Sequence, residues 1–375
     1  MLKLMIVYGT RPEVIKLAPL IQELNRHSAS ISLRTCFTGQ HREMVEPLLR
    51  LFGLRPDHEL ALMEHGQGLE HITTAVLTRF TDILREDRPD WVIVQGDTTT
   101  AMAAALSAFY ARIRIAHVEA GLRTWDRTQP FPEEANRAII DLLSDACFAH
   151  SQQARGNLLR EAIPADRIRV TGNTVIDAVL AVSQMPLKTS IPQVRRVLDD
   201  GRKLVLVTAH RRENHGQPIV EICLALAELA ARYRERAIFI YPVHLNPAVQ
   251  EPVKLHLSGI ENMVLTDPLE YEVLAHLIKR AHFVMTDSGG LQEEAPAFGK
   301  PVLILREVTE RPEVVEAGTA RIVGTDRAAI VSAATALMDD AAAYERMARI
   351  ACPYGDGTAS RQIRAYFQEI GGVAQ

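Results

Sequence analysis

Three acidic side chains in the first half of the chain occupy positions from which they could do acid–base chemistry. Asp97 follows the apolar run Trp91–Gln95, Glu119 ends another apolar run, and Glu133 begins the helix-period stretch Glu133–Leu143. Carboxylates at one level of a sheet can transfer protons to and from a substrate, and clustered carboxylates raise one another's proton affinity, which would let one act as an acid. The alternative for Asp97 is a helix cap.

A histidine and two arginines open the second half of the chain. His210, Arg211 and Arg212 come directly after the apolar run Leu204–Thr208, and histidine is the common acid–base group near neutral pH. The alternative is a surface loop that ends in a capping Asn214.

Two segments suit a bound diphosphate. In the first, Gly9 permits a sharp turn, a helix begins with free N–H groups, and Arg11 and Lys16 add positive charge. The alternative to a diphosphate site at this segment is a capped helix with solvated charges. The spacing is not G-x-G-x-x-G, which argues against a nicotinamide enzyme.

The second diphosphate segment follows the predicted strand Phe283–Thr286. It is a turn into a helix, and its backbone N–H groups could hold an anion. Glu294 could accept hydrogen bonds from ribose hydroxyls, and Arg311 is a further cation after the next strand. The turn itself consists of Ser288, Gly289 and Gly290.

Length and composition narrow the class of protein. A chain of 375 residues with 47% hydrophobic residues can bury two cores, and a formal charge of −4 gives no reason to expect a nucleic-acid partner. The four cysteines form no C-x-x-C pair, which fits a reducing compartment. No apolar run approaches the roughly 20 residues that cross a bilayer, so we expect a cytoplasmic protein. No histidine or cysteine cluster has ligand spacing, and we predict no metal.

Strands and helices alternate along the whole chain, which predicts parallel, doubly wound sheets. Residues 185–192 form a polar stretch with two prolines, which predicts a linker between two series of alternating strands and helices. We therefore predict an α/β protein of two Rossmann-like domains, residues 1–183 and 184–358, with a last helix, residues 359–375, that crosses back to the first. Ligands of such sheets bind beyond the carboxyl ends of the strands, so we expect the two domains to face a central cleft.

The candidate catalytic and binding residues lie near the ends of the predicted strands and helices. The strands are Leu4–Tyr8, Ile31–Thr38, Trp91–Gln95, Ile115–Val118, Cys147–Ala149, Lys203–Thr208, Ala237–Tyr241, Met263–Leu265, Phe283–Thr286 and Val302–Leu305. The helices are Pro12–Leu24, Leu69–Leu84, Ala101–Tyr110, Glu133–Leu143, Gln152–Glu161, Val175–Val182, Ile219–Tyr233, Tyr271–Lys279, Arg327–Leu337 and Ala359–Ile370.

Taken together, six short motifs resemble those of the non-hydrolysing UDP-N-acetylglucosamine 2-epimerases, in order and over essentially the whole chain. They are Gly9-Thr10-Arg11-Pro12-Glu13, Gly96-Asp97-Thr98, His117 to Arg123, Pro132 to Arg137, His210 to Asn214 and Asp287-Ser288-Gly289-Gly290. The resemblance implies a fold of the glycosyltransferase-B type, interconversion of UDP-GlcNAc and UDP-ManNAc, a homodimer, no external redox cofactor and a role in surface-polysaccharide precursor synthesis.

The resemblance also implies roles for individual residues. The acid–base set would be Asp97, Glu119, Glu133 and His210. The UDP contacts would be Arg11, Lys16, Ser288, Gly289, Gly290, Glu294 and Arg311. A neighbouring site for a second, activating UDP-GlcNAc would use Gln40, His41, Gln67, Glu134, Arg211 and His244. One position departs from the family: Leu274 stands where relatives often place a phenylalanine near the uracil, and a leucine covers a ring with less specific geometry.

The implied reaction explains why several acid–base groups are needed. Carbon 2 of an N-acetylhexosamine is not next to a carbonyl, so its hydrogen is barely acidic. Elimination of UDP across carbons 1 and 2, followed by re-addition after a proton arrives on the opposite face, avoids this barrier. The alternatives are an epimerase for a modified UDP-sugar such as a diacetamido-uronic acid, a hydrolysing epimerase, a glycosyltransferase and a non-enzymatic UDP-sugar sensor.

Overall fold

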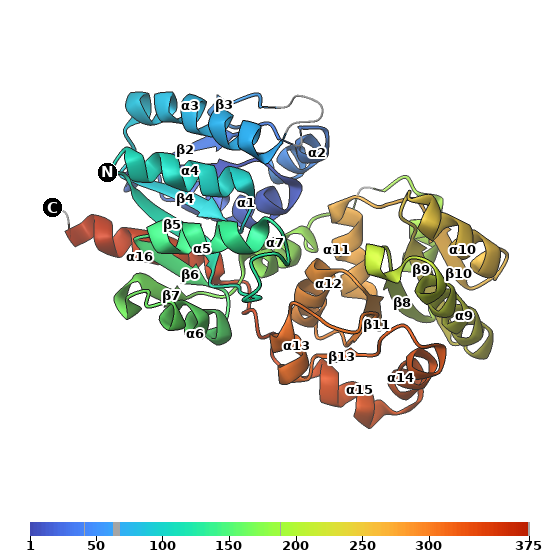
Figure 1. The fold of residues 1–375 in the computed structure, drawn as a ribbon. Coiled ribbons are helices and arrows are strands. Elements are labelled where there is room, and N and C mark those ends of the chain that lie inside the picture. The colour runs from blue at the N-terminus through green and yellow to red at the C-terminus, as the bar shows by residue number, and fades with distance from the viewer. Residues whose placement is uncertain (41, 63–67, 188, 374–375) are drawn as a thin grey trace. The chain divides into compact units, whose positions relative to one another are not determined.

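The computed structural model describes residues 1–40, 42–62, 68–187 and 189–373. The chain forms two compact units (Figure 1). Unit 1 contains Met1–Ala178 and Tyr354–Gln375, and unit 2 contains Val179–Pro353. Both boundaries lie a few residues before the positions 183 and 358 that the sequence suggests.

Unit 1 is built on a seven-stranded sheet whose paired strands are all parallel, in the order β3-β2-β1-β4-β5-β6-β7. The central strands are buried along most of their length, as expected where helices cover both faces of a parallel sheet. The strands are β1 (Leu2–Tyr8), β2 (Ile31–Phe37), β3 (His58–Glu59), β4 (Trp91–Gln95), β5 (Arg114–Ala120), β6 (Ala146–Ala149) and β7 (Ile168–Val170).

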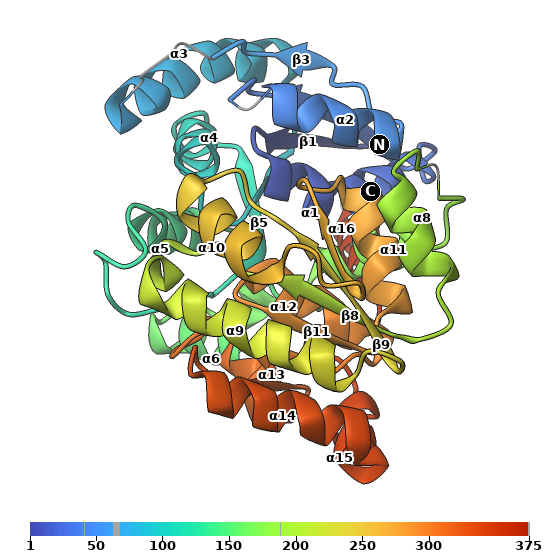
Figure 2. The same cartoon turned by 90° about the vertical axis from the view of Figure 1, so that its right-hand side faces the viewer.

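Helices lie on both faces of this sheet. On one face α4 packs between α3 and α5, and on the other α1 packs against α2 and α16 (Figures 1 and 2). The helices are α1 (Arg11–Asn25), α2 (Arg42–Phe52), α3 (Leu69–Asp87), α4 (Thr99–Tyr110), α5 (Glu133–Leu143), α6 (Gln152–Arg160), α7 (Thr174–Val182), which runs into unit 2, and α16 (Ala359–Val373).

The end of the chain completes unit 1. Phe367 of α16 is fully buried, with its ring edge-on to Trp91 at 5.6 Å between centroids. The start of α16 is held by Asp177 of α7, which accepts hydrogen bonds from the backbone N–H groups of Ala359 (3.2 Å) and Ser360 (2.8 Å). The chain therefore re-enters unit 1 beside the point where it left.

Unit 2 repeats the architecture with six parallel strands, in the order β10-β9-β8-β11-β12-β13. The strands are β8 (Lys203–Thr208), β9 (Ala237–Pro242), β10 (Met263–Thr266), β11 (Phe283–Thr286), β12 (Val302–Ile304) and β13 (Ala320–Ile322). The helices are α8 (Pro192–Asp199), α9 (Gln217–Arg232), α10 (Pro247–Leu257), α11 (Tyr271–Arg280), α12 (Gly289–Glu294), α13 (Pro312–Ala317), α14 (Arg327–Asp339) and α15 (Ala341–Ala348). Two successive doubly wound parallel sheets confirm the predicted fold class.

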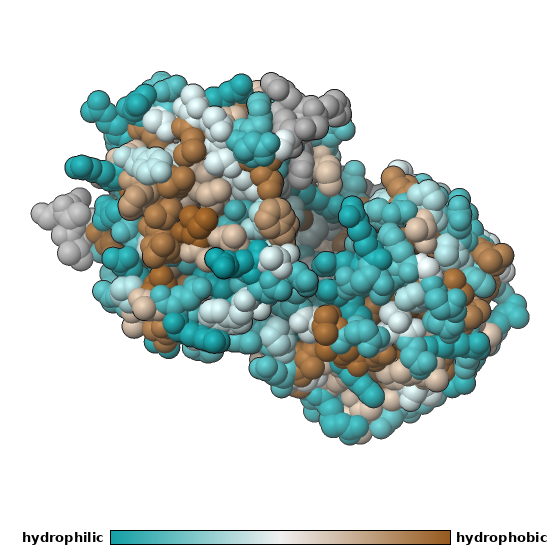
Figure 3. Space-filling view, in the orientation of Figure 1, coloured by the Kyte–Doolittle hydropathy of each residue, from teal (hydrophilic) through white to brown (hydrophobic). Residues whose placement is uncertain are grey.

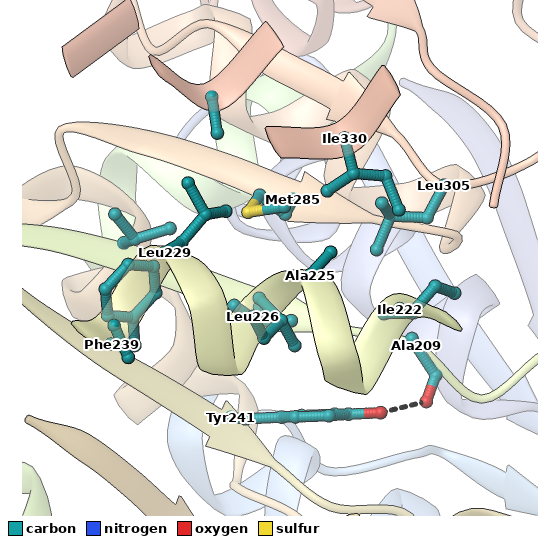
Figure 4. Close-up of a cluster of buried hydrophobic side chains, with 14 of the residues drawn as sticks. Ala209, Ile222, Ala225, Leu226, Leu229, Phe239, Tyr241, Met285, Leu305 and Ile330 are labelled. Atoms are coloured by element: carbon teal, nitrogen blue, oxygen red, sulfur yellow. Dashed lines mark hydrogen bonds between the residues drawn. The ribbon is translucent and has the colours of Figure 1, made fainter. Parts of the chain in front are cut away.

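The core of unit 2 also positions its functional end. Figure 4 shows α9 placing Leu226 and Leu229 among side chains from the sheet and α14, in a continuous buried cluster. At the edge of this cluster the hydroxyl of Tyr241, which is fully buried, donates to the carbonyl of Ala209 at 2.6 Å. That bond fixes the backbone directly before His210.

The surface of unit 1 carries an apolar stripe over α4 and α5 (Figure 3). The exposed large apolar residues there are Phe109 and Tyr110 at the end of α4, and Ile139 and Leu142 on α5. Over the described ranges, no helix is long and apolar enough to span a membrane.

Candidate active site

Asp97 lies just beyond β4, where Gly96 turns the chain with a φ of +71°. The guanidinium of Arg137 from α5 donates to its carboxylate, and the amide of Asn136 donates to its backbone carbonyl at 3.0 Å. The side chain of Asp97 keeps 27% of its surface exposed. The cap of α4 is Thr98, whose hydroxyl accepts from the N–H of Ala101, so the alternative interpretation of Asp97 as a cap is wrong.

Glu119 occupies a bulge in β5. Its φ is +68°, a left-handed conformation that few non-glycine residues adopt, and the register with β6 shifts between Val118 and Ala120. The carboxylate accepts from the ammonium of Lys16 at 2.5 Å and 2.6 Å, from the amide of Asn173 at 3.0 Å, and from the amide of Gln95. Strained residues of this kind are typical of functional sites. The hydrogen bonds to its carboxylate help to hold Glu119 in this conformation.

The first two predicted carboxylates are thus paired with cations rather than with each other. Arg137 neutralises Asp97 and Lys16 neutralises Glu119, so the structure does not support the expectation that clustered carboxylates raise one another's proton affinity. Glu133 is the first residue of α5 and is half-buried. In the part of the chain that the structure describes, no side chain or N–H group hydrogen-bonds its carboxylate.

Glu134, expected in the activating site, is buried inside unit 1. Its carboxylate accepts from the backbone N–H groups of Thr124 (3.1 Å) and Trp125 (2.9 Å) and from Arg137 at 3.1 Å. Since Arg137 also donates to Asp97, a continuous chain of hydrogen bonds joins Glu134 to Asp97.

The loop between β1 and α1 is organised by Glu13. Its buried carboxylate accepts from the N–H groups of Gly9 (2.9 Å) and Thr10 (2.7 Å) and from the hydroxyl of Thr98 at 2.7 Å. Burial raises the pKa of Glu13, although these hydrogen bonds oppose the shift. The N–H groups of the two residues before α1 are therefore satisfied internally. Arg11, half-buried at the start of α1, remains at this end of the sheet.

Residues at the corresponding end of unit 2 are arranged around the fully buried Asp287. Its carboxylate accepts from the backbone N–H groups of His210 and Arg211, both at 2.7 Å, and from the amide of Asn214 at 3.0 Å. Asn214 therefore does not cap a helix; it supports the loop. The ring of His210 stacks on that of His244, with centroids 5.4 Å apart and planes 12° apart.

The surroundings of His210 favour its neutral form. Burial is the largest cause and lowers its pKa from the ordinary value of 6.5. The attraction of Asp287, whose carboxylate lies 3.6 Å from Nδ1, opposes this shift, and repulsion by His244 and Arg211 adds to it. A neutral imidazole near pH 7 can accept a proton.

Two guanidinium groups converge on the turn that begins α12. A methyl group built on Gly289 would lie 3.8 Å from Nη2 of Arg211 and 3.9 Å from Nη2 of Arg311. Nε of Arg311 donates to Glu293, which sets the direction of its side chain. Ser288 is the N-cap residue of α12, and Gly290 is exposed. This end of unit 2 therefore combines backbone N–H groups with two positive charges, as an anion site requires.

The other predicted binding residues are placed as follows. Glu294 ends α12 and is buried, and Leu274 is half-buried in α11. Gln40 accepts from the hydroxyl of Thr100 at 2.5 Å. His41 and Gln67 lie outside the described residues. No three His, Cys, Asp or Glu side chains of the described ranges come together as a metal ion would require.

Several residues of these networks were not assigned a role from the sequence. Gln95 is a polar residue ending an otherwise apolar strand, and Asn173 lies in a Gly-Asn-Thr turn; both signals are visible in the sequence. Asn136 and Arg137 lie within a quoted motif, but their contacts with Asp97 depend on how α5 packs beside β4.

The chain is similar in sequence to proteins of one known family. Residues 22–368 match the family model described as UDP-N-acetylglucosamine 2-epimerase. The UDP-N-acetylglucosamine 2-epimerase of Yersinia pestis is 48% identical over 367 residues, 96% of this chain and 97% of the relative.

Solved structures show the same similarity. A putative UDP-N-acetylglucosamine 2-epimerase from Listeria monocytogenes has a TM-score of 0.92 and 40% identity, covering 98% of this chain and 96% of that one. The UDP-GlcNAc 2-epimerase from Neisseria meningitidis, solved bound to UDP-GlcNAc, has a TM-score of 0.86 and 44% identity, covering 98% and 100%.

Proposed function

The chain belongs to the UDP-N-acetylglucosamine 2-epimerase family, a family of isomerases, and we propose that it interconverts UDP-GlcNAc and UDP-ManNAc by inverting carbon 2. One observation gives the proposal its strongest support. Asp97 and Glu119 are held at the carboxyl ends of the neighbouring strands β4 and β5 by buried donors, and Glu119 keeps a strained backbone there. The product would feed surface-polysaccharide precursor synthesis.

The reaction proceeds by elimination and re-addition. A base removes the hydrogen of carbon 2 while the bond from carbon 1 to UDP breaks, which leaves a 2-acetamidoglucal. A proton then reaches carbon 2 from the opposite face, and UDP adds back to carbon 1. Because the two proton transfers use opposite faces, the sugar needs more than one acid–base group. Asp97, Glu119, Glu133 and His210 are that set.

The departing diphosphate requires fixed positive charge. Arg211, Arg311 and the N–H groups at the start of α12 would stabilise the charge that develops on UDP, and Arg11 and Lys16 would add to it from unit 1. Lys16 bonds Glu119 at 2.5 Å, so one side chain would link the acid–base set to the diphosphate contacts.

The nucleoside would lie against unit 2. The Ser288–Gly290 turn would hold the phosphates, Glu294 would accept from the ribose, and Leu274 would cover the uracil. The four cysteines, all within the described residues, form no disulfide, which fits the reducing cytoplasm in which we place the reaction.

An activating UDP-GlcNAc would bind next to the substrate. Of the residues expected for it, Glu134 supports the proposal most directly, because it reaches Asp97 through Arg137. A ligand that shifted Glu134 would therefore act on Asp97 through existing hydrogen bonds, and one that shifted His244 would act on His210 through their stacked rings.

We also propose a homodimer formed through the apolar stripe of unit 1, since contiguous exposed apolar surface is typical of interaction sites. Sedimentation of the Leu142→Lys variant tests it. Monomers are expected where the wild type sediments as a dimer, and an unchanged dimer would place the interface elsewhere.

The activity is tested by incubating the protein with UDP-GlcNAc in deuterium oxide and following proton NMR. Epimerisation predicts UDP-ManNAc that carries deuterium at carbon 2, with little free UDP. Accumulation of UDP and free ManNAc would select the hydrolysing reaction. Absence of exchange would contradict both, and modified UDP-sugars would then be the substrates to test.

A further inference from the structure

Asp141 of α5 is a fully buried carboxylate that binds three groups from the end of β5 and the loop after it. Its Oδ1 lies 2.6 Å from Nδ1 of His117. Its Oδ2 accepts from the backbone N–H of Gly121 at 3.1 Å and from Nη2 of Arg123 at 2.6 Å. This one carboxylate therefore connects α5 to residues that precede and follow Glu119 in the sequence.

The ring of His117 bridges Asp141 and the turn before Asp97. Its Nε2 lies 2.7 Å from the carbonyl oxygen of Gly96, which can only accept, so Nε2 must carry a hydrogen. The ring is fully buried, and Nδ1 faces Asp141. Burial would raise the pKa of Asp141, but the charge and hydrogen bond of His117, followed by those of Arg123, hold it below its ordinary value. His117 thus joins Asp141 to the carbonyl of Gly96 through its two ring nitrogens.

Arg123 is the cation of this cluster. Its side chain is 1% exposed and pairs with the buried Asp141 and with the exposed Glu161. Removing the charge of Asp141 would leave a buried guanidinium without its buried partner, which is costly.

The position of the cluster connects it to the acid–base residues. Glu119, with its φ of +68°, lies midway between His117 and Gly121, the two residues of its own strand region that Asp141 binds. Gly121 cannot be replaced or moved freely, since a Cβ there would lie 2.3 Å from the carbonyl oxygen of Ala154. Through Nε2 of His117 the cluster also holds the carbonyl of Gly96, directly before Asp97.

We infer that Asp141 is a positioning residue for the reaction, which holds the Glu119 bulge and the Gly96–Asp97 turn in register through His117 and Gly121. The inference rests on the proposed function, in which Glu119 and Asp97 serve carbon 2. A displacement of about 1 Å at reacting groups lowers rates about 100-fold. Unit 2 carries the main UDP contacts, so a change at Asp141 should affect turnover more than substrate binding.

The test is Asp141→Asn, which keeps the shape of the side chain and removes its charge. We expect kcat for UDP-GlcNAc to fall about 100-fold while KM changes less than about three-fold. Misplaced acid–base groups also delay re-protonation, so we expect more free UDP and 2-acetamidoglucal per UDP-ManNAc formed. This product ratio is measured per turnover and does not depend on the fraction of folded enzyme.

Asp145→Asn is the matched control. Asp145 accepts from the N–H of Ile115 at 2.9 Å, at the opposite end of the same strand, and takes no part in the proposed site. The Asp145→Asn variant should have the kcat and the product ratio of the wild type. An Asp141→Asn variant with the wild-type ratio, or with activity lost only in proportion to its unfolded fraction, would overturn the inference.

His117→Gln provides a second route if Asp141→Asn does not fold. Glutamine can donate to Gly96 or to Asp141 but not to both, so the same change in product ratio is expected, and the wild-type ratio would overturn the inference. ¹⁵N NMR of His117 in the wild type should show Nε2 protonated, and an unprotonated Nε2 would contradict its bond to the carbonyl of Gly96. A wild type that forms no UDP-ManNAc would instead contradict the proposed function.

Discussion

The two sheets place an aspartate at the same point and use it in opposite ways. β4 in unit 1 and β11 in unit 2 both pair with the first strand of their unit, and an aspartate follows each, Asp97 after Gly96 and Asp287 directly. Asp97 is bound by a side chain, Arg137, and is 27% exposed. Asp287 is bound by two backbone N–H groups and an amide and is fully buried.

The comparison shows that strand position alone does not set how exposed a carboxylate is. The hydrogen-bond donors around the carboxylate decide how much of it remains exposed. Backbone donors make Asp287 part of the scaffold that carries His210 and Arg211, whereas the side-chain donor of Asp97 leaves part of its surface open to a substrate. The surrounding charge differs as well, since Lys16 and Arg137 pair with the carboxylates in unit 1, whereas two guanidinium groups converge on Gly289 in unit 2.

The sharpest test of this difference is the same substitution at both aspartates. Asp97→Ala should lower turnover by at least about 100-fold, the usual contribution of an acid–base group, and leave UDP binding intact. Asp287→Ala should lower the free energy of unfolding by roughly 3 kcal/mol, because three buried donors lose their acceptor. Steady-state kinetics, UDP titration and denaturant unfolding measure these effects. A larger loss of stability for Asp97→Ala than for Asp287→Ala would reverse the assignment.

The cationic character of unit 2 is tested by Arg311→Gln. We expect the Kd for UDP to rise about 10- to 100-fold, since hydrogen bonds to charged groups contribute about 1.5–3 kcal/mol. Isothermal titration with UDP measures it. Arg212→Gln is the control, because Arg212 is exposed in the turn after His210. Equal losses in both variants would mean that general positive charge, rather than the placement of Arg311 beside Gly289, binds the diphosphate.

The smallest expected effect concerns the pH dependence of His210. Its pKa lies below 6.5, so a reaction that needs neutral His210 should lose kcat/KM only as the pH falls below that value. His244→Asn removes a repelling and covering neighbour and should raise the pKa of His210 toward 6.5. The acidic limb of the pH profile should therefore move to higher pH, by less than about one unit. A limb that moves to lower pH would contradict this account of His210.

Most of the fold could be predicted from the sequence because its central strands are continuous apolar runs, such as Trp91–Gln95. The strands missed were short: β3 has two residues, and β7 and β13 have three each. Such strands form because the neighbouring sheet supplies partners, which local sequence does not record. The helices missed include α10, which contains Pro252 in its interior, but also α2 and α8, whose buried apolar residues recur at helical spacing.

The candidate site was predictable as residue types after strands, but its charge pairs were not. Nothing in the spacing of Lys16 and Glu119, 103 positions apart, indicates that they bond, and the same holds for Arg137 and Asp97. These pairs arise from which strands become neighbours in the sheet, and they change what the carboxylates can do.

The way the chain closes unit 1 has a consequence for synthesis on the ribosome. The bond between the N–H of Asn173 and the carbonyl of Tyr354, at 2.8 Å, joins residues separated by the whole of unit 2. Until α16 emerges, Trp91 lacks the ring of Phe367 against which it packs. Unit 2, though second in sequence, is therefore the first whose residues are all available for folding, and unit 1 must wait for the last helix to be translated.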